Sequence, residues 1–438
     1  MRRLSVIGAG ESGIGAALLA KKKGYKVFVS DNGKIIEKDI LSQNNIEWEE
    51  EKHSISKISL SEEVIKSPGV PESTSIIKNI RQIGIPIISE IEFASRYTES
   101  KIIAVTGSNG KTTTVSLIGE ILKKAGFDVL VAGNIGTGFA RSIIKRDYKY
   151  IVLELSSFQL DGIKDFRADI SIILNISADH LDRYDYDFNN YIQSKLRITI
   201  NKKKEDVLIY NIDDMNIVDN LKTKCHTIPF SIHRNLDSCG AYLIGNQVNI
   251  NLNNEKMTIQ ELGLQGKHNI YNSMAASIAT RVLDVKDFII RQSLQDFKNV
   301  EHRLEHVINV HGIEFINDSK ATNINSVWFA LESMEKKVVW IVGGVDKGND
   351  YSELLDLVKE KVKAIVCIGE NKEKLHKIFK TSVDNIVDAS SMNEAVAYSY
   401  ELAEKGDAVL LSPACASFDM FSNFEERGMK FKNSVRSL

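Results

Sequence analysis

Short apolar runs alternate with helix-length stretches along nearly the whole chain, and this alternation restricts the possible fold more than any other feature. The runs are rich in Val and Ile, as is typical of buried β-strands. Clear examples are Leu4–Ile7, Lys101–Val105, Tyr150–Leu155, Ile170–Leu174 and Val338–Val342. Because strands separated by helices form parallel βαβ sheets, we predict an α/β protein.

The alternation restarts twice, which suggests three domains in a chain of 438 residues. We predict a Rossmann-like domain over residues 1–93, a central P-loop mononucleotide-binding α/β domain over 94–298, and a C-terminal Rossmann-like α/β domain over 299–438. In the central domain, Ala241–Leu252 has the pattern of an antiparallel hairpin that turns at Gly245-Asn246.

Charge and cysteine content exclude several classes of protein. Lys and Arg total 56 against 58 Asp and Glu, so the near-neutral chain gives no reason to expect nucleic acid or an anionic membrane as a partner. No apolar run approaches the ~20 residues that cross a bilayer, and the N-terminus lacks the pattern of a secretory signal. The 4 cysteines are scattered without a CxxC pair, which indicates neither a disulfide framework nor a cysteine zinc site. We therefore expect a cytoplasmic protein.

The strongest local motif is Gly107-Ser108-Asn109-Gly110-Lys111-Thr112, between an apolar run and a helical stretch. Glycines there let backbone N–H groups surround phosphate oxygens at a helix N-terminus. Lys111 adds a positive charge, and the Thr112 hydroxyl is suited to Mg²⁺. The motif departs from G-x-x-x-x-G-K-[ST] because Val105 replaces its first glycine. The alternative is a glycine-rich strand-to-helix turn with an incidental lysine.

A second glycine motif, Gly8–Gly13, matches G-x-G-x-x-G after the first strand, with Asp31 at the distance expected for a ribose contact. Considered alone, it predicts an NAD-binding domain. It specifies only a nucleotide-shaped crevice, however, and a purely structural βα turn remains the alternative.

Polar residues at the ends of two central strands suggest chemistry, whereas a nearby lysine does not. Glu154 ends a buried-looking strand, where a carboxylate could hold a metal near Thr112. His180 follows another strand, although a loop histidine is more often structural or solvated. Lys195 has the pattern of an exposed lysine on a helix surface.

Together these segments resemble the Mur ligase family, and within it the D-glutamate-adding type. The resemblance covers essentially the whole chain, in order. The motifs that carry it are 106–112, 133–136, 154–160, 179–184, 195–197, 266–269, 301–303, 317–323, 343–347 and 412–417.

The resemblance implies an ATP-dependent ligase that joins D-glutamate to UDP-N-acetylmuramoyl-L-alanine for peptidoglycan synthesis. ATP would phosphorylate the alanine carboxylate, and the amine of D-glutamate would attack the acyl phosphate. ATP and two Mg²⁺ ions are the implied cofactors, the partners are small molecules, and a monomer is expected.

The resemblance also implies roles for residues of the central domain. Lys111, Asn134, His180 and Lys195 would be catalytic. The residues expected at ATP are Gly107, Ser108, Asn109, Gly110, Lys111, Thr112, Thr113, Asn269, Asn272, Arg303 and Asp318. The metal ligands would be Thr112, Glu154, His180 and Lys195. Lys195 would be carbamylated, which turns an ammonium into the oxygen donor that Mg²⁺ prefers.

The two acceptor substrates are assigned by the same resemblance. The residues expected at the UDP substrate are Glu11, Ser12, Asp31, Ser67, Pro68, Gly69, Asn134 and His180. Those expected at D-glutamate are Lys320, Thr322, Lys347, Ser417 and Phe424. Cations and hydroxyls suit a ligand with two carboxylates. Cys415 has no activating base nearby in sequence, so we expect it to pack rather than to react.

Other functions remain open at this point. A folylpolyglutamate synthase or a Mur ligase for another amino acid would share the fold, although the former lacks a UDP-binding domain. An NAD-dependent oxidoreductase would leave the Gly107–Thr112 motif unexplained. A non-catalytic nucleotide sensor would bind ATP without ligation.

Overall fold

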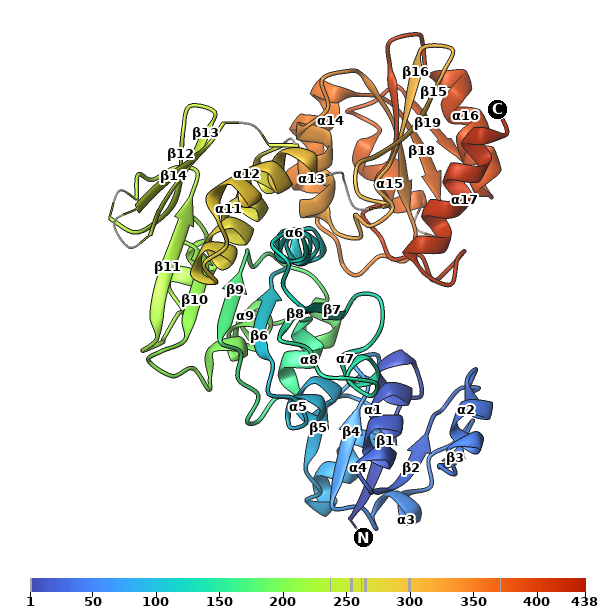
Figure 1. Cartoon of the computed structure of the whole chain (residues 1–438). Helices are drawn as coiled ribbons and strands as arrows, with labels where there is room; N and C mark the ends of the chain where they lie inside the picture. Colours follow the sequence, from blue (N-terminus) through green and yellow to red (C-terminus); the bar gives the residue numbers. More distant parts are fainter. Residues whose placement is uncertain are drawn as a thin grey trace. The chain divides into compact units, whose positions relative to one another are not determined.

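The computed structural model describes residues 2–236, 238–252, 255–260, 262–263, 266–297, 301–370 and 372–438. Its strands form three sheets that follow one another along the chain and are mainly parallel, as predicted (Figure 1). The chain divides into two compact units. The first is Met1–Ala178, Arg183–Gly263 and Asn269–Asp296, and the second is Asp179–Asp182, Leu264–His268 and Phe297–Leu438. The predicted boundary at 298/299 lies outside the described residues, and the one at 93/94 stays a prediction.

The first sheet has the parallel strand order β3-β2-β1-β4-β5, which agrees with a Rossmann-like domain. Its strands are β1 (Arg3–Ile7), β2 (Lys26–Ser30), β3 (Glu47–Glu49), β4 (Glu63–Lys66) and β5 (Ile87–Ser89). Its helices are α1 (Glu11–Lys22), α2 (Lys38–Gln43), α3 (Ile55–Ile58), α4 (Ser75–Ile83) and α5 (Glu90–Ser95).

The second sheet has the order β14-β13-β12-β11-β10-β9-β6-β8-β7. Its strands are β6 (Lys101–Thr106), β7 (Val129–Gly133), β8 (Tyr150–Glu154), β9 (Ile170–Ile173), β10 (Val207–Asn211), β11 (His226–Ser231), β12 (Gly240–Ile244), β13 (Gln247–Leu252) and β14 (Glu255–Ile259). The α-helices are α6 (Lys111–Lys124), α7 (Phe139–Ser142), α8 (Ser157–Asp161), α9 (Phe188–Leu196), α10 (Met215–Val218), α11 (Lys267–Val282) and α12 (Asp287–Asp296). Two 3₁₀ turns are η1 (Leu181–Arg183) and η2 (Arg197–Thr199). The predicted hairpin is confirmed as the antiparallel pair β12 and β13.

The third sheet, in the second unit, has the order β15-β16-β20-β17-β18-β19 and is parallel except for β15. Its strands are β15 (Glu305–Val310), β16 (Ile313–Asn317), β17 (Val338–Gly343), β18 (Val362–Ile368), β19 (Asn385–Asp388) and β20 (Ala408–Leu411). Its helices are α13 (Ile324–Glu332), η3 (Tyr351–Leu354), α14 (Leu355–Lys361), α15 (Lys372–Phe379), α16 (Met392–Leu402) and α17 (Phe424–Arg436).

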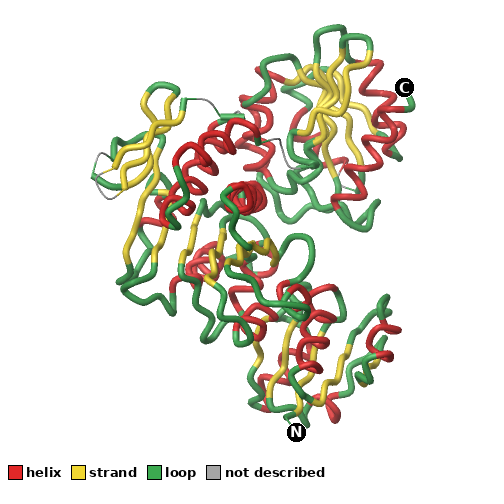
Figure 2. The backbone as a smooth tube through the Cα atoms, in the orientation of Figure 1, coloured by secondary structure: helices red, strands yellow, loops and turns green. Residues whose placement is uncertain are grey.

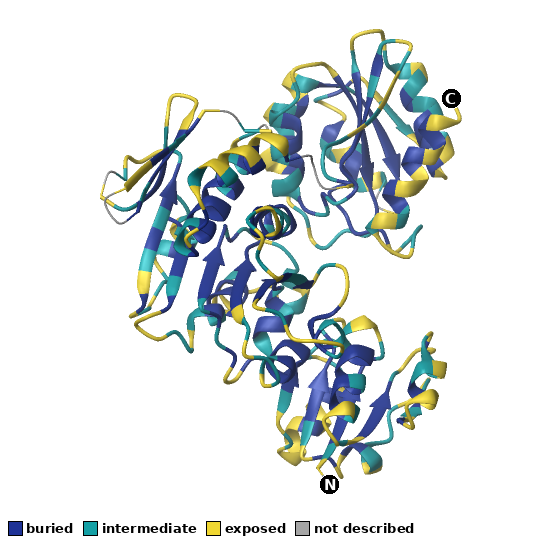
Figure 3. Ribbon diagram, viewed as in Figure 1, coloured by how far each residue is buried: buried dark blue, intermediate teal, exposed yellow. Residues whose placement is uncertain are grey.

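The apolar runs that predicted the strands form the cores of these sheets. Figure 2 shows helices outside the strands of the third sheet, and Figure 3 shows its strands buried while the helices expose their outer faces. β17 is buried at every position, which explains its unbroken apolar sequence. Among the described residues, no helix combines the length and hydropathy needed to cross a bilayer.

Within the first unit, α5 joins the first sheet to the second. Ser89 caps this helix by accepting a hydrogen bond from the Glu92 amide. The Glu92 side chain is fully buried, and its Oε2 accepts hydrogen bonds from three successive backbone amides, those of residues 164–166, at 2.8–2.9 Å. One buried carboxylate thus satisfies three successive backbone donors, of which the Phe166 amide is buried.

We expect Glu92→Ala to destabilise the first unit by about 3 kcal/mol, since it leaves three successive backbone amides, one of them buried, without their acceptor. The measurement is the urea unfolding midpoint followed by tryptophan fluorescence and circular dichroism. Glu62→Ala, at an exposed glutamate of the same region, is the control and should change the midpoint little. Equal effects of the two substitutions would contradict a clamping role for Glu92.

Candidate active site

The Gly107–Thr112 motif, the predicted phosphate loop, lies between β6 and α6, in the strand-to-helix setting that its sequence predicted. Gly110 caps α6 with a positive φ of 83°, a conformation that favours glycine. A Cβ atom at this position would also lie 2.3 Å from Oδ1 of Asn272. Both facts favour glycine at the start of α6, and the contact of this loop with a phosphate stays a prediction.

Residues after β9 hold the loop in shape. The Asn109 amide donates to Asn175 Oδ1 at 2.8 Å, and the Ser108 hydroxyl donates to the Ser177 carbonyl at 2.8 Å. β9 is a neighbour of β6 in the sheet, so its carboxyl end lies beside the loop. Asn175 is a site residue without a predicted role, although a polar residue directly after a buried strand is a signal for one.

A buried cluster of oxygen donors lies at the next strand end. Thr112 Oγ1 donates to Glu154 Oε2 at 2.7 Å, and Asn134 Nδ2 donates to Glu154 Oε1 at 3.1 Å. Thr112 and Glu154 are almost fully buried. β8 and β7 place these residues, since Glu154 ends β8 opposite Gly133. A hydroxyl and a carboxylate held together in this way fit Mg²⁺, which prefers oxygen ligands.

Two lysine side chains converge on the loop backbone. Lys111 Nζ donates to the carbonyls of Gly107 and Ser108 at 2.7 and 2.8 Å. Lys195 Nζ donates to the Gly107 carbonyl at 2.8 Å and lies 4.6 Å from the centre of the Tyr191 ring.

The interpretation of Lys195 as an exposed surface lysine, suggested by its pattern alone, is wrong. Its side chain is only 2 % exposed, because the inner face of α9 carries it against the loop. As an ammonium, Lys195 donates hydrogen bonds and cannot ligate a cation.

Residues from α11 and the first turn of α6 complete this side of the site. Thr114 Oγ1 donates to Asn272 Oδ1 at 3.3 Å, and Asn272 Nδ2 donates to Asn269 Oδ1 at 3.2 Å. Thr113 Oγ1 is buried without a hydrogen-bond partner among the described residues. The structure therefore links Asn269 and Asn272 to the first turn of α6, while the contact of these residues and Thr113 with ATP stays a prediction.

In the first sheet, the Gly8–Gly13 turn is closely packed. A Cβ atom on Gly13 would lie 1.9 Å from the Gly8 carbonyl oxygen. Both Asp31 carboxylate oxygens accept backbone amides, from Ala9 at 2.5 Å and Gly33 at 2.7 Å.

Ser67 also contributes to the shape of this turn. Its hydroxyl donates to the Gly8 carbonyl at 2.7 Å. Like Asp31, it has a clear structural role there, and its predicted ligand role stays a prediction.

The remaining UDP-substrate candidates surround this turn. Glu11 Oε2 lies 3.1 Å from Arg141 Nη1, and Ser12 is half-buried. The Pro68 carbonyl accepts from Arg183 at 3.1 Å. Gly69 faces open space, since an added Cβ would meet nothing within 4 Å. Such an opening beside a glycine turn allows a ligand to approach the protein backbone closely.

In the second unit, Asp318 follows β16 and is buried. It accepts hydrogen bonds from Ser412 Oγ at 2.8 Å and from the Leu304 amide at 3.2 Å. Burial raises the pKa of Asp318 to about 7, against the opposing effect of Arg303. The structure thus confirms that Asp318 and Arg303 are near each other, while their contact with ATP stays a prediction.

The D-glutamate candidates are linked by the backbone of the second unit. Lys320 Nζ lies 4.9 Å from the centre of the Phe424 ring. Backbone hydrogen bonds between Val345 and Ala416, at 3.0 and 3.2 Å, join the segments that carry Lys347 and Ser417. Ser417 is buried and Thr322 is half-buried.

Arg427 connects the segments that contain Ser319 and Cys415, and it was not predicted from the sequence. It is 1 % exposed and donates to the Ser319 carbonyl at 2.8 Å and the Cys415 carbonyl at 3.0 Å. An arginine on the inner face of the last helix was the only signal. Burial raises the pKa of the Cys415 thiol to about 11, so this cysteine is neutral, as its expected packing role requires.

His180 lies in the Asp179–Asp182 segment, which belongs to the second unit. Its neighbour Asp179 lies 3.2 Å from Lys347 Nζ and accepts from Asn323 at 3.0 Å. Burial would raise the pKa of Asp179, but Lys347 and His180 lower it to about 2. The predicted association of His180 with Lys195 and Asn134 stays a prediction.

Family models match most of the chain. The model of the MurD N-terminal domain matches residues 3–76, that of the Mur ligase middle domain matches 105–280, and that of the Mur ligase, glutamate ligase domain, matches 302–415. The chain is 50 % identical over 444 residues to the UDP-N-acetylmuramoylalanine–D-glutamate ligase of Christiangramia forsetii, covering 100 % of both chains. The chain belongs to the Mur ligase family, in its MurD branch.

Other relatives of this Mur ligase carry the same name. The ligase of Porphyromonas gingivalis strain W83 is 49 % identical, with 99 % of this chain and 98 % of the relative covered. That of Salinibacter ruber is 40 % identical, with 100 % and 98 % covered.

Solved structures support the fold of the Mur ligase. A pseudomurein peptide ligase type C from Methanothermus fervidus matches with a TM-score of 0.63 at 21 % identity, over 100 % of both chains. The UDP-N-acetylmuramate-alanine ligase MurC from Thermotoga maritima matches with a TM-score of 0.63 at 17 % identity, again over 100 % of both.

Proposed function

We propose that this protein is an ATP-dependent ligase that adds D-glutamate to UDP-N-acetylmuramoyl-L-alanine in peptidoglycan precursor synthesis. The observation that carries the proposal is the buried Thr112–Glu154 pair, with the exposed Asn134 bonded to it, beside the Gly107–Thr112 loop. It occurs in a chain about half identical, over its full length, to curated ligases of this name. The proposed setting is the cytoplasm, with a monomeric protein, small-molecule substrates, and neither nucleic acid nor a membrane as partner.

The phosphate loop would hold the ATP phosphates. Its backbone amides and the N-terminus of α6 favour negative charge, and Lys111 would exchange its two carbonyl partners for phosphate oxygens. Mg²⁺, held by Thr112 and Glu154, would neutralise charge on the phosphates. We further propose a second ion near His180 and Lys195, which requires carbamylation of Lys195, because its ammonium offers no lone pair.

The chemistry solves one problem, which is that a carboxylate is a poor electrophile. Transfer of the terminal phosphoryl group of ATP to the alanine carboxylate converts one of its oxygens into a leaving group and releases ADP. The amine of D-glutamate then attacks the acyl carbon, the C–O bond to phosphate breaks, and the amine loses a proton. The protein positions three reactants and stabilises phosphoryl charge, which are large effects in such reactions.

The substrates would occupy separate parts of the chain. The UDP end would lie at the Gly8–Gly13 turn, where Gly10 and Gly69 leave open space. Asn134 would orient the alanine carboxylate beside Glu154. D-Glutamate would bind in the second unit between Lys320, Lys347 and Ser417, whose charge and hydrogen-bonding capacity suit two carboxylates.

Phosphate release assays test the proposal directly. Phosphate should form only when ATP, Mg²⁺, UDP-N-acetylmuramoyl-L-alanine and D-glutamate are all present. A scan of other amino acids tests the alternative ligases, and Lys111→Ala should remove the activity because phosphoryl charge loses its cation. Turnover with another amino acid in preference to D-glutamate would contradict the proposed substrate.

We expect Lys195→Ala to be inactive and to recover part of its activity with acetate or formate. A small carboxylate can supply the anionic oxygen that carbamylation would provide. Lys195→Arg should not be rescued, because a permanent cation fills the same space. Kinetics with and without formate measure the effect, and full activity of unrescued Lys195→Ala would exclude a metal-binding role.

We expect Lys347→Ala to raise the KM for D-glutamate at least tenfold while changing the KM for the UDP substrate less than twofold. The variant removes a cation from the second unit alone. It should therefore weaken the binding of D-glutamate in both the ground state and the transition state, which raises its KM. Lys359→Ala, at an exposed lysine of α14, is the matched control and should change neither constant. A higher KM for the UDP substrate, with an unchanged KM for D-glutamate, would contradict the assignment of Lys347 to D-glutamate.

A further inference from the structure

Three side chains with different metal-binding chemistry meet in the second unit, apart from the residues assigned above. The ligand atoms of Cys367, His376 and Asp388 all lie within 4.8 Å of one another. Cys367 comes from β18, Asp388 from β19, and His376 from α15. His376 Nε2 and Asp388 Oδ1 are 2.9 Å apart.

The backbone explains why these side chains converge. Cys367 and Asp388 are directly opposite each other in neighbouring parallel strands, so both side chains point to the same face of the sheet. Cys367 packs in one core cluster with Leu375 and Phe379 of α15, so that face is the one α15 covers. The His376 side chain of α15 therefore lies over the same sheet face as Cys367 and Asp388.

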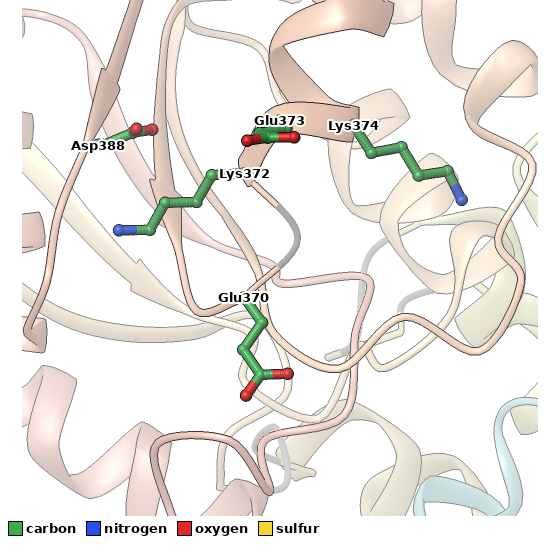
Figure 4. Close-up of a pocket in the computed structure, with 5 residues that line it drawn as sticks. All are labelled: Glu370, Lys372, Glu373, Lys374 and Asp388. Atoms are coloured by element: carbon green, nitrogen blue, oxygen red, sulfur yellow. The ribbon is translucent and has the colours of Figure 1, made fainter.

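An ion could reach this cluster from solvent. Cys367 is fully buried, but the His376 and Asp388 side chains are 41 % and 49 % exposed. Asp388 lines a cavity of about 500 Å³ together with Glu370, Lys372, Glu373 and Lys374. Figure 4 shows Asp388 and Lys372 on one side of this cavity, with Lys374 extending away from them. The Lys372 ammonium is directed to the Ala389 carbonyl at 2.7 Å.

We propose that Cys367, His376 and Asp388 bind a zinc ion, with water from the cavity as its fourth ligand. A thiolate, an imidazole and a carboxylate are the ligand types that zinc accepts, whereas Mg²⁺ prefers oxygen alone. One thiolate and one carboxylate balance the charge of Zn²⁺. Binding replaces the thiol proton of Cys367, which passes to solvent.

The other metal-ligand cluster in the described residues has a different explanation. Glu301, His302 and Glu305 also lie close together. Lys432 Nζ, however, lies 2.8 Å from Glu301 Oε1 and 2.6 Å from Glu305 Oε1. A lysine already balances these carboxylates, so this cluster carries no metal proposal.

Zinc bound by Cys367, His376 and Asp388 would have a structural effect that does not depend on the ligase reaction. β19 is the edge strand of the third sheet, and its described residues are only Asn385–Asp388. A metal that joins its last residue to β18 and α15 would fasten this edge. Such binding stabilises the folded state by mass action.

Cobalt and zinc titrations of the purified full chain test the site, after chelator treatment and removal of the chelator. Co²⁺ should bind one per chain and give thiolate-to-metal charge-transfer absorption, which Zn²⁺ abolishes and Mg²⁺ leaves unchanged. Cys367→Ser should remove the absorption, and both Cys367→Ser and His376→Ala should weaken Zn²⁺ binding at least tenfold. Cys225→Ser, at a buried cysteine outside the cluster, is the matched control and should bind like the unmodified chain.

Two results would overturn the proposal. One is the absence of thiolate absorption in the unmodified chain at saturating Co²⁺, and the other is absorption that survives Cys367→Ser. Circular dichroism and the phosphate release assay check the folding of each variant. If Cys367→Ser does not fold, His376→Ala decides the question, because its half-exposed side chain is removable without opening the core. Unchanged Zn²⁺ affinity in His376→Ala would then reject the site.

Discussion

The loop between β6 and α6 is the constraint on which the rest of the site depends. Its first helical turn begins at Gly110, where a positive φ favours glycine and a Cβ would lie 2.3 Å from Asn272 Oδ1. Residues from neighbouring strands hold this loop in its conformation through hydrogen bonds. The segment after β9 supplies Asn175, and the end of β8 supplies Glu154, because both strands border β6 in the sheet. The parallel order of the strands is therefore what assembles the site.

Several buried charged groups in this protein are bonded to backbone groups, whereas others, such as Asp179 with Lys347, form ion pairs. Glu92 accepts three successive amides, while Arg427 donates to the carbonyls of Ser319 and Cys415. Lys195 donates to the Gly107 carbonyl. Such contacts fix the course of loops, since a backbone segment bound to a rigid charged side chain cannot shift without leaving that charge unsatisfied.

The two nucleotide-type motifs show why a motif has to be interpreted with its surroundings. Gly8–Gly13 alone favours NAD, yet its parallel sheet belongs to a chain that also contains a phosphate loop and a MurD N-terminal domain match. Asp31, the residue expected at a ribose, accepts amides on both sides of the turn. Its identity is therefore explained by the geometry of the turn as well as by a ligand, and the motif on its own cannot separate the two.

The sequence by itself determined the order of strands and helices, the phosphate loop and the family. These depend on periodicity, glycine spacing and residues close in the chain, so local patterns carry them. Only the tertiary structure decided that Lys195 is buried, that Arg427 binds two distant carbonyls, and that Cys367, His376 and Asp388 meet. In each of these cases, strand pairing or helix packing brings together residues from different elements. Their spacing in the sequence carries no period that could have predicted the contact.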